Sequence, residues 1–187
     1  MSGQPKRIHP HKFTLWVALG SIIMMFAGLT SAYIVKRNQD GWQSFELPKI
    51  FWYSTLVILV SSLTVQMALR SFQEREMGRY RLMITVTAGL GILFIVLQVA
   101  GFYAFQSAGL KMYGRGSSPS YSFLLAIGGL HALHVLGGVI ALLVMFLRAF
   151  SKKIRSYSSV PIEVVSTYWH FVDVLWIYLF VFFNWLK

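Results

Sequence analysis

The chain has 187 residues, of which 56% are hydrophobic and 12% charged; this composition excludes an ordinary soluble protein and indicates an integral membrane protein. The formal net charge is +11, but the basic residues lie beside apolar segments, as membrane topology and anionic lipid headgroups require, so we expect no nucleic-acid binding. The sequence contains no cysteine, which excludes disulfides, covalently attached haem, iron–sulfur clusters and thiolate copper sites.

Five apolar stretches follow one another along the chain, each long enough for the roughly 20 residues that cross a hydrocarbon core. They lie at residues 13–35, 50–69, 82–106, 120–147 and 162–186. The first follows a basic start but exceeds the roughly 7–15 residues of a signal-peptide core, so we expect a retained span. Glycine and proline punctuate the short joints, none of which could hold a second domain. The sequence predicts an all-α fold, a single membrane domain over residues 1–187 with five transmembrane helices.

Lysine and arginine are unequally divided between the two sides of this predicted bundle. The amino-terminal stretch and the second and fourth joints hold 11 of the 17 basic residues, and the other side holds 6. Because cytoplasmic segments of membrane proteins carry an excess of basic residues, we expect the amino terminus in the cytoplasm and the carboxyl terminus outside it.

The fourth stretch carries His131 and His134 at helical spacing, flanked by Gly128-Gly129 and Gly137-Gly138. Paired small residues allow a neighbouring helix to approach closely. One interpretation makes His131, His134 and His170 ligands of a b-type haem or a metal, because imidazole suits iron and copper. The other makes them interhelical hydrogen-bond partners, which we favour because the chain has no carboxylate-rich ligand set.

Two glutamines lie inside apolar stretches, Gln66 in the second and Gln98 in the third. An amide in hydrocarbon needs a partner, and the nearest partners are on neighbouring helices. We expect both glutamines to act as interhelical hydrogen-bond donors.

The fifth stretch contains Tyr-Trp-His-Phe-Val-Asp at residues 168–173. His170 and Asp173 stand three residues apart and would share a helix face. Asp173 is either a proton-relay group or a buried acceptor that fixes the fifth helix to the fourth. A rise of about 1.5 Å per residue puts Asp173 about 14 Å from the cytoplasmic membrane edge, with His134 nearest in depth. We therefore predict a direct or water-bridged contact between the histidines of the fourth helix and the His170–Asp173 face.

Two motifs resemble the hallmarks of a known family. Residues 168–176, Tyr-Trp-His-Phe-Val-Asp-Val-Leu-Trp, and residues 129–135, Gly-Leu-His-Ala-Leu-His-Val, are similar to signatures of subunit III of haem–copper cytochrome oxidases, in the same order and at a similar separation. Weaker similarities lie in the other stretches, for example at residues 26–28 and 97–98. Many members have seven helices, and this chain resembles the short form that lacks the first two, which is also seen in quinol oxidases and with some nitric oxide reductases.

The resemblance implies a redox-inactive subunit that packs on the catalytic subunit, holds structural lipids and supports sustained proton uptake during oxygen reduction. It implies no catalytic, cofactor-binding or metal-binding residue in this chain. Haem and copper belong to the partner subunits I and II, and phospholipid is the expected ligand. His131, His134, His170 and Asp173 carry over as conspicuous polar positions. Many members also carry a membrane-buried glutamate where this chain has Ile22, so no role of that carboxylate carries over.

We therefore expect an accessory subunit of a haem–copper terminal oxidase of aerobic respiratory electron transport, and among these a cytochrome c oxidase of a bacterial inner membrane, with its carboxyl terminus in the periplasm. A subunit of a quinol oxidase or nitric oxide reductase is the alternative within the family. A self-sufficient haem-b redox protein is the alternative from another class. The sequence leaves open the electron donor, the identity of the bound lipids and membership of a larger respiratory supercomplex.

Overall fold

The computed structural model describes residues 10–38, 42, 47–107, 119–150 and 159–186. These residues form five long helices: α1 (Pro10–Arg37), α2 (Ile50–Gln73), α3 (Met77–Ser107), α4 (Pro119–Phe150) and α5 (Val160–Trp185). All five are long and apolar enough to cross a membrane. Even α2, with 24 residues at a rise of about 1.5 Å each, is longer than the thickness of a hydrocarbon core, which is about 30 Å. The predicted all-α fold with five spans is confirmed. Each predicted span lies within a helix, except that α5 ends one residue earlier than expected.

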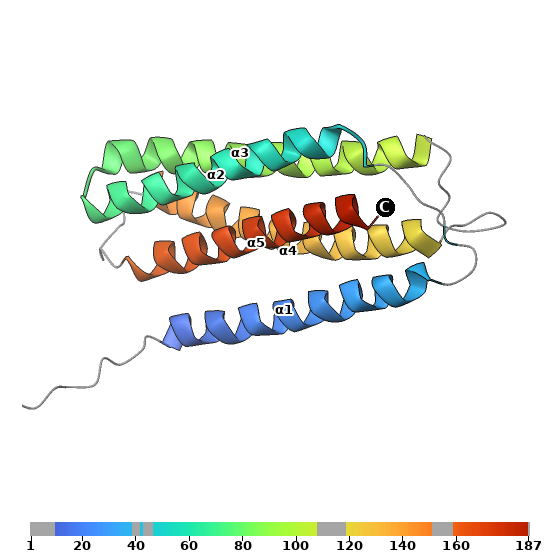
Figure 1. The fold of residues 1–187 in the computed structure, drawn as a ribbon. Helices are drawn as coiled ribbons and strands as arrows, with labels where there is room; N and C mark the ends of the chain where they lie inside the picture. The colour runs from blue at the N-terminus through green and yellow to red at the C-terminus, as the bar shows by residue number, and fades with distance from the viewer. Residues whose placement is uncertain (1–9, 39–41, 43–46, 108–118, 151–158, 187) are drawn as a thin grey trace, which may run out of the picture.

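The helices form three layers (Figure 1), with α2 and α3 on one side, α4 and α5 in the middle and α1 on the other side. Successive helices run in opposite directions, so α1, α3 and α5 begin at the same end of the bundle. Among the described residues, α5 contacts α1, α2 and α4, whereas the backbone of α1 contacts neither α2 nor α3. Consequently α1 and α2 flank α5 without meeting each other.

The connection between α2 and α3 is a tight turn that caps the end of α2. Arg75 has a φ of 62°, in the left-handed region. The backbone N–H of Glu76 donates to the carbonyl of Ser71 at 2.9 Å, and that of Arg75 donates to the carbonyl of Phe72 at 3.2 Å. This pair of bonds is the Schellman arrangement, which satisfies the last carbonyls of a helix. It turns the chain back at once, so α3 packs antiparallel to α2.

Trp169 of α5 lies in a slot between α3 and α4. Its side chain is fully buried, and a Cβ added to either Gly91 of α3 or Gly138 of α4 would lie 2.9 Å from its ring. The indole Nε1 donates to Ser61 Oγ of α2 at 3.1 Å. The close helix approach expected at the Gly137-Gly138 pair therefore occurs at Gly138, where there is no room for a side chain.

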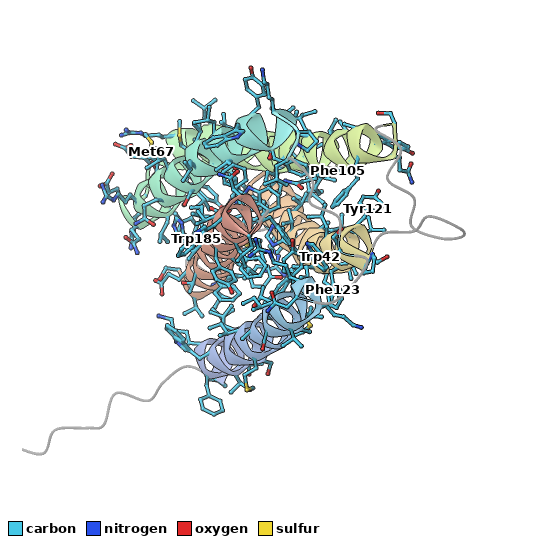
Figure 2. The ribbon with its side chains drawn as sticks, turned by 45° about the vertical axis from the view of Figure 1, so that its right-hand side comes forward. Trp42, Met67, Phe105, Tyr121, Phe123 and Trp185 are labelled. Atoms are coloured by element: carbon cyan, nitrogen blue, oxygen red, sulfur yellow. The ribbon has the colours of Figure 1, made fainter. Side chains whose placement is uncertain are left out.

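The carboxyl-terminal end of α5 is surrounded by aromatic rings. Tyr33 of α1 is fully buried, and its ring meets those of Trp42 and Phe123 edge on, with centroids 4.8 and 6.2 Å apart. The rings of Phe105 in α3 and Tyr121 in α4 lie 6.0 Å apart, also at this end (Figure 2). This end of the bundle is therefore filled by aromatic rings, and the Tyr33 hydroxyl and Trp42 Nε1 are buried there without a hydrogen-bond partner among the described residues.

Candidate functional site

His170 lies between two polar side chains of α2. Its Nδ1 is 2.6 Å from Ser62 Oγ, and its Nε2 is 3.2 Å from Gln66 Oε1. Because an amide oxygen can only accept, Nε2 carries the proton, and in the neutral ring Nδ1 accepts from the Ser62 hydroxyl. The imidazole is thus held in one orientation by bonds that cross from α5 to α2.

Two further hydrogen bonds join α5 to hydroxyl groups of α2, and both are donated by tryptophan. Trp169 donates to Ser61, and Trp176 Nε1 donates to Thr55 Oγ1 at 3.0 Å. Sequence reasoning missed these hydroxyls. A signal was present, because Thr55 and Ser62 stand seven residues apart and share a helix face. We call this set of contacts between α2 and α5 the polar seam.

The expected roles of the two glutamines are partly met. Gln98 Nε2 donates to Ser54 Oγ at 3.2 Å, which confirms the predicted interhelical donor. Gln66 also makes an interhelical bond, but it accepts through Oε1 rather than donating. Gln66 therefore bonds to a neighbouring helix as expected, but the predicted direction of the hydrogen bond was wrong.

Asp173 is buried in the polar seam, with 2% of its surface exposed. Neither carboxylate oxygen has a hydrogen-bond partner among the described residues. The Ser62 hydroxyl of this seam makes its short contact with His170 instead. Because an ionised carboxylate without partners is costly in an apolar interior, this group is the least satisfied polar side chain of the seam.

The two histidines of α4 face other surroundings. His131 is 1% exposed, and neither of its ring nitrogens has a hydrogen-bond partner in the described part of the chain. Its ring stacks on Trp176, with centroids 5.2 Å apart, and meets Phe26 and Phe94 edge on. His134 directs Nδ1 to the carbonyl of Leu130 in its own helix, 2.7 Å away.

The predicted direct contact between the α4 histidines and the His170–Asp173 face is therefore not formed. His170 bonds to α2, and Asp173, one turn further along, lies on the same face. The side of α5 that meets α4 is occupied by Tyr168, whose hydroxyl donates to the carbonyl of His134 at 3.0 Å, and by Trp169 against Gly138. Among the described residues, no hydrogen bond joins the α4 histidines to Asp173, although the His131 ring stacks on Trp176, one turn beyond Asp173.

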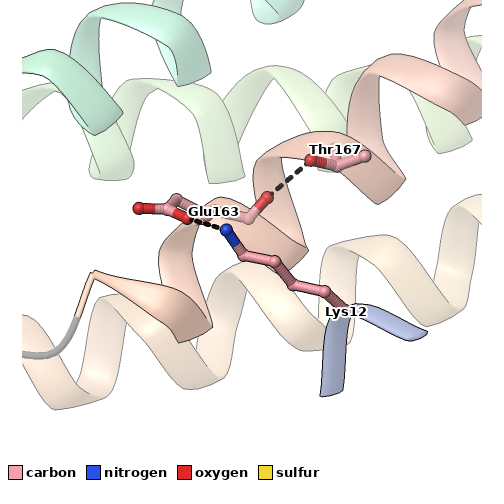
Figure 3. Close-up of polar contacts among 3 residues, drawn as sticks. All are labelled: Lys12, Glu163 and Thr167. Carbon is pink, nitrogen blue, oxygen red and sulfur yellow. Dashed lines mark hydrogen bonds and ion pairs between the residues drawn. The ribbon is translucent and has the colours of Figure 1, made fainter. Parts of the chain in front are cut away.

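A cleft of about 300 Å³ lies at the amino-terminal end of α5, between α1 and α2. Its wall includes Lys12, Leu69, Glu163 and Thr167. Lys12 Nζ and Glu163 Oε2 form an ion pair at 2.7 Å, with side chains 44% and 25% exposed. Thr167 donates to the carbonyl of Glu163 at 2.8 Å (Figure 3). The cleft therefore brings a charged, partly solvated entrance to within one helical turn of His170.

The comparison with known proteins identifies the family. A sequence model described as cytochrome c oxidase subunit III matches residues 38–187, a range that includes α2 to α5 and thus the whole polar seam. The chain belongs to the cytochrome c oxidase subunit III family.

Relatives of this family match along most of the chain. A probable cytochrome c oxidase subunit 3 of Mycobacterium leprae is 34% identical over 88% of this chain and 82% of the relative. Cytochrome c oxidase subunit 3 of Bacillus sp. strain PS3 is 28% identical over 88% and 80%. Cytochrome bo(3) ubiquinol oxidase subunit 3 of Pseudomonas aeruginosa is 28% identical over 90% and 81%. This subunit III is accordingly a multi-pass membrane subunit of a haem–copper oxidase, with other oxidase subunits as partners.

The three histidines of α4 and α5, His131, His134 and His170, do not converge on a shared haem or metal site. Among the described residues, no three His, Cys, Asp or Glu side chains are grouped as ligands. His170 faces α2, His131 lies among aromatic rings, and His134 bonds within α4. A metal centre needs ligands that converge on one point, and these three diverge.

Proposed function

We propose that this chain is the non-redox accessory subunit III of a cytochrome c oxidase, which stabilises the catalytic subunit and supports proton uptake during oxygen reduction. The family match over residues 38–187 carries the proposal. Haem and copper would be bound by subunits I and II, and residues 1–187 would form a single membrane domain without a catalytic residue. The divergence of His131, His134 and His170 supports a structural use of these side chains.

The accessory role is tested by comparing the oxidase purified with and without this chain. We expect the oxidase without it to keep its haem spectrum and its initial rate of oxygen reduction, because no redox centre is lost. Its proton uptake should be slower and its activity should fall during continued turnover. Immediate loss of electron transfer, with the other subunits intact, would contradict an accessory role.

The electron donor decides between two members of the family. The names of the Mycobacterium and Bacillus relatives specify cytochrome c oxidases, whereas that of the Pseudomonas relative specifies a ubiquinol oxidase. We favour cytochrome c because the Mycobacterium leprae relative is 34% identical and the Pseudomonas relative 28%. Copurification with a copper-bearing subunit II would support this choice, and a complex lacking that copper would favour quinol.

We propose a bacterial inner-membrane location with the amino terminus in the cytoplasm and the carboxyl terminus in the periplasm. The basic residues support this orientation, because 11 of the 17 lie on the side of the bundle that holds the amino terminus. Cytoplasmic segments of membrane proteins carry an excess of basic residues. The fourth joint includes residues 151–158, which lie outside the described residues. A reporter fused after Arg155 should be active in the cytoplasm, and periplasmic activity of that fusion would refute the orientation.

We also propose that the subunit retains phospholipid. A second cleft, of about 490 Å³, lies where α4 ends and α5 begins. It is lined mostly by apolar side chains, including Val144, Met145 and Val164, with Arg148 at its edge. An acyl chain suits the apolar wall and an anionic headgroup suits the arginine. Phospholipid should remain bound through purification in mild detergent, and an Arg148→Gln variant should retain less of it.

A further inference from the structure

Helix α1 is attached to the bundle differently from the other four helices. Among the described residues, α2, α3, α4 and α5 form a closed ring in which each helix contacts two others of the ring, whereas α1 lies outside it, against α4 and α5 (Figure 1). In the most apolar segment of α1, 17% of the residues are buried, against 28% to 44% in the other helices. Removing α1 would therefore break no contact between helices of the ring.

The packing of α1 lacks the close helix approach that is found inside the ring. A Cβ added to Gly138 of α4 would lie 2.9 Å from the Trp169 ring. One added to Gly20 or Gly28 of α1 would have no neighbour within 4 Å. Helices in lipid associate through close packing and interhelical hydrogen bonds, and the glycines of α1 contribute nothing to close packing.

Two aromatic side chains, seven residues apart on one face of α1, fix it to the ring. Phe26 is 1% exposed and meets the rings of His131 and His134 of α4 edge on, with centroids 6.5 and 5.8 Å away. Tyr33 is fully buried and contacts Phe182 of α5 at a centroid distance of 5.2 Å. We call the surface of α4 and α5 under Phe26 and Tyr33 the seat of α1.

Most of the unpaired polar atoms of the described structure lie at this seat. Six buried side-chain nitrogen and oxygen atoms have no hydrogen-bond partner among the described residues, and four of them belong to His131, Tyr33 and Trp42. His131 packs against Phe26, and Trp42 packs on Tyr33 with ring centroids 4.8 Å apart. A buried polar atom without a partner costs free energy, so these atoms partly offset the gain from aromatic packing.

Two polar links join α1 to α5, and both are weak. The Tyr178 hydroxyl donates to Thr30 Oγ1 at 3.0 Å, but Tyr178 is 46% exposed. The ion pair between Lys12 and Glu163 is partly exposed as well, and exposed pairs contribute little to stability.

Leaving the seat does not require α1 to unfold. A helix that crosses a bilayer satisfies its backbone hydrogen bonds within itself. The 28 residues of α1 are long and apolar enough to span a hydrocarbon core without a neighbour. Separation of α1 therefore costs the contacts at the seat and the polar links, and not the helix itself.

We propose that α1 is a strap that separates from the α2–α5 ring as an intact helix while the ring stays folded. The family match supports this division, because it covers residues 38–187 and thus the ring without α1. Opening of the strap breaks the Lys12–Glu163 pair and takes Phe26 away from the unpaired nitrogens of His131. A partner that binds α1 and the ring together stabilises the closed strap, since binding to one state favours that state.

Energy transfer between two dyes on the full chain tests the order of separation. The sequence has no cysteine, so introduced cysteines carry the only labels. Met24→Cys with Leu133→Cys reports the distance from α1 to α4, and Leu63→Cys with Leu133→Cys reports the distance from α2 to α4. The Met24, Leu133 and Leu63 side chains are 71%, 63% and 67% exposed, so labelling them leaves the packing intact.

The two labelled pairs are compared during an SDS titration in mixed micelles. The α1–α4 pair should lose energy transfer at a lower mole fraction of SDS than the α2–α4 pair. Coincident transitions, or an earlier transition of the α2–α4 pair, would overturn the proposal.

Two substitutions distinguish the strap from the ring. Tyr178→Phe removes the bond to Thr30 and should lower the SDS midpoint of the α1–α4 pair only. Thr55→Val removes a hydrogen-bond acceptor inside the ring and should lower the midpoint of the α2–α4 pair only. Equal shifts of both midpoints in either variant would show a single cooperative unit, against the proposal.

Discussion

Helix α5 meets α4 and α2 in two different ways. Against α4 it packs mainly through size, because Gly138 leaves room for the Trp169 ring, and the Tyr168 hydroxyl donates to the backbone carbonyl of His134 and not to a side chain. Against α2 it packs through polar groups, because His170, Trp169 and Trp176 all bond to side chains of α2. Helices in lipid gain little from apolar burial alone, so close packing and interhelical hydrogen bonds are the two available means of association.

The difference suggests a division of roles between the two interfaces. The slot around Trp169 has no room for a side chain at Gly91 or Gly138, so substitutions there should lower the stability of the fold. A polar seam contributes less stability per contact, since interhelical hydrogen bonds in membranes are worth on average about 0.6 kcal/mol. We therefore expect variants of the α4 side to affect folding most, and variants of the α2 side to affect stability less.

The largest loss should follow Trp169→Ala. The substitution empties the slot between Gly91 and Gly138 and removes the bond to Ser61, and replacing a buried tryptophan by alanine costs about 3–5 kcal/mol. The free energy of unfolding, measured by SDS titration in mixed micelles, should fall by that amount. Trp185→Ala is the control, because Trp185 is 83% exposed. Equal losses in the two variants would show that the slot is not a centre of packing.

Adjacent glycines of α4 should respond in opposite ways. A Cβ at Gly138 would lie 2.9 Å from the Trp169 ring, whereas one at Gly137 would meet only the Tyr168 hydroxyl at 3.8 Å. Gly138→Ala should therefore cost about 1–3 kcal/mol through overpacking. Gly137→Ala should be neutral or stabilising, because alanine favours the helix. If Gly138→Ala is as stable as Gly137→Ala, the contrast between the two interfaces is wrong.

A single bond of the polar seam should matter less. Thr55→Val keeps the shape of the side chain but leaves the Trp176 N–H without its acceptor, which costs about 1–2 kcal/mol for a buried donor. Thr85→Val is the matched control, since the Thr85 hydroxyl is exposed and bonds to the carbonyl of Arg81 in its own helix. A loss as large as that of Trp169→Ala would show that the seam contributes as much to the free energy of unfolding as the slot does.

The ion pair at the cleft should contribute least. Lys12 and Glu163 are partly exposed, and such pairs are worth about 0.2–1 kcal/mol. Lys12→Gln should therefore lower the free energy of unfolding only slightly, and the difference should shrink as salt is added because salt screens exposed charges. A loss that is large and independent of salt would indicate that the pair is sealed from solvent.

Which helices exist could be read from the sequence, but which helices meet could not. The five spans follow from the length of apolar runs, and the close approach at Gly138 follows from its paired glycines. Helical spacing also placed His170 and Asp173 on one face. It could not tell that this face meets α2, and the short joint between α4 and α5 favoured the wrong neighbour. The spacing of Thr55 and Ser62 in α2 could have identified this neighbour. The two hydroxyls share a face of α2 and bond to Trp176 and His170 of α5.

The central claim is that this chain serves an oxidase whose redox centres lie in other subunits. Its most direct test is the haem and copper content of two preparations made through an affinity tag on this chain, one in mild detergent with its partners and one of the chain alone. We expect haem and copper in stoichiometric amounts in the first preparation and neither metal in the second. Stoichiometric haem or copper in the isolated chain, or a mild-detergent preparation free of both, would contradict the account.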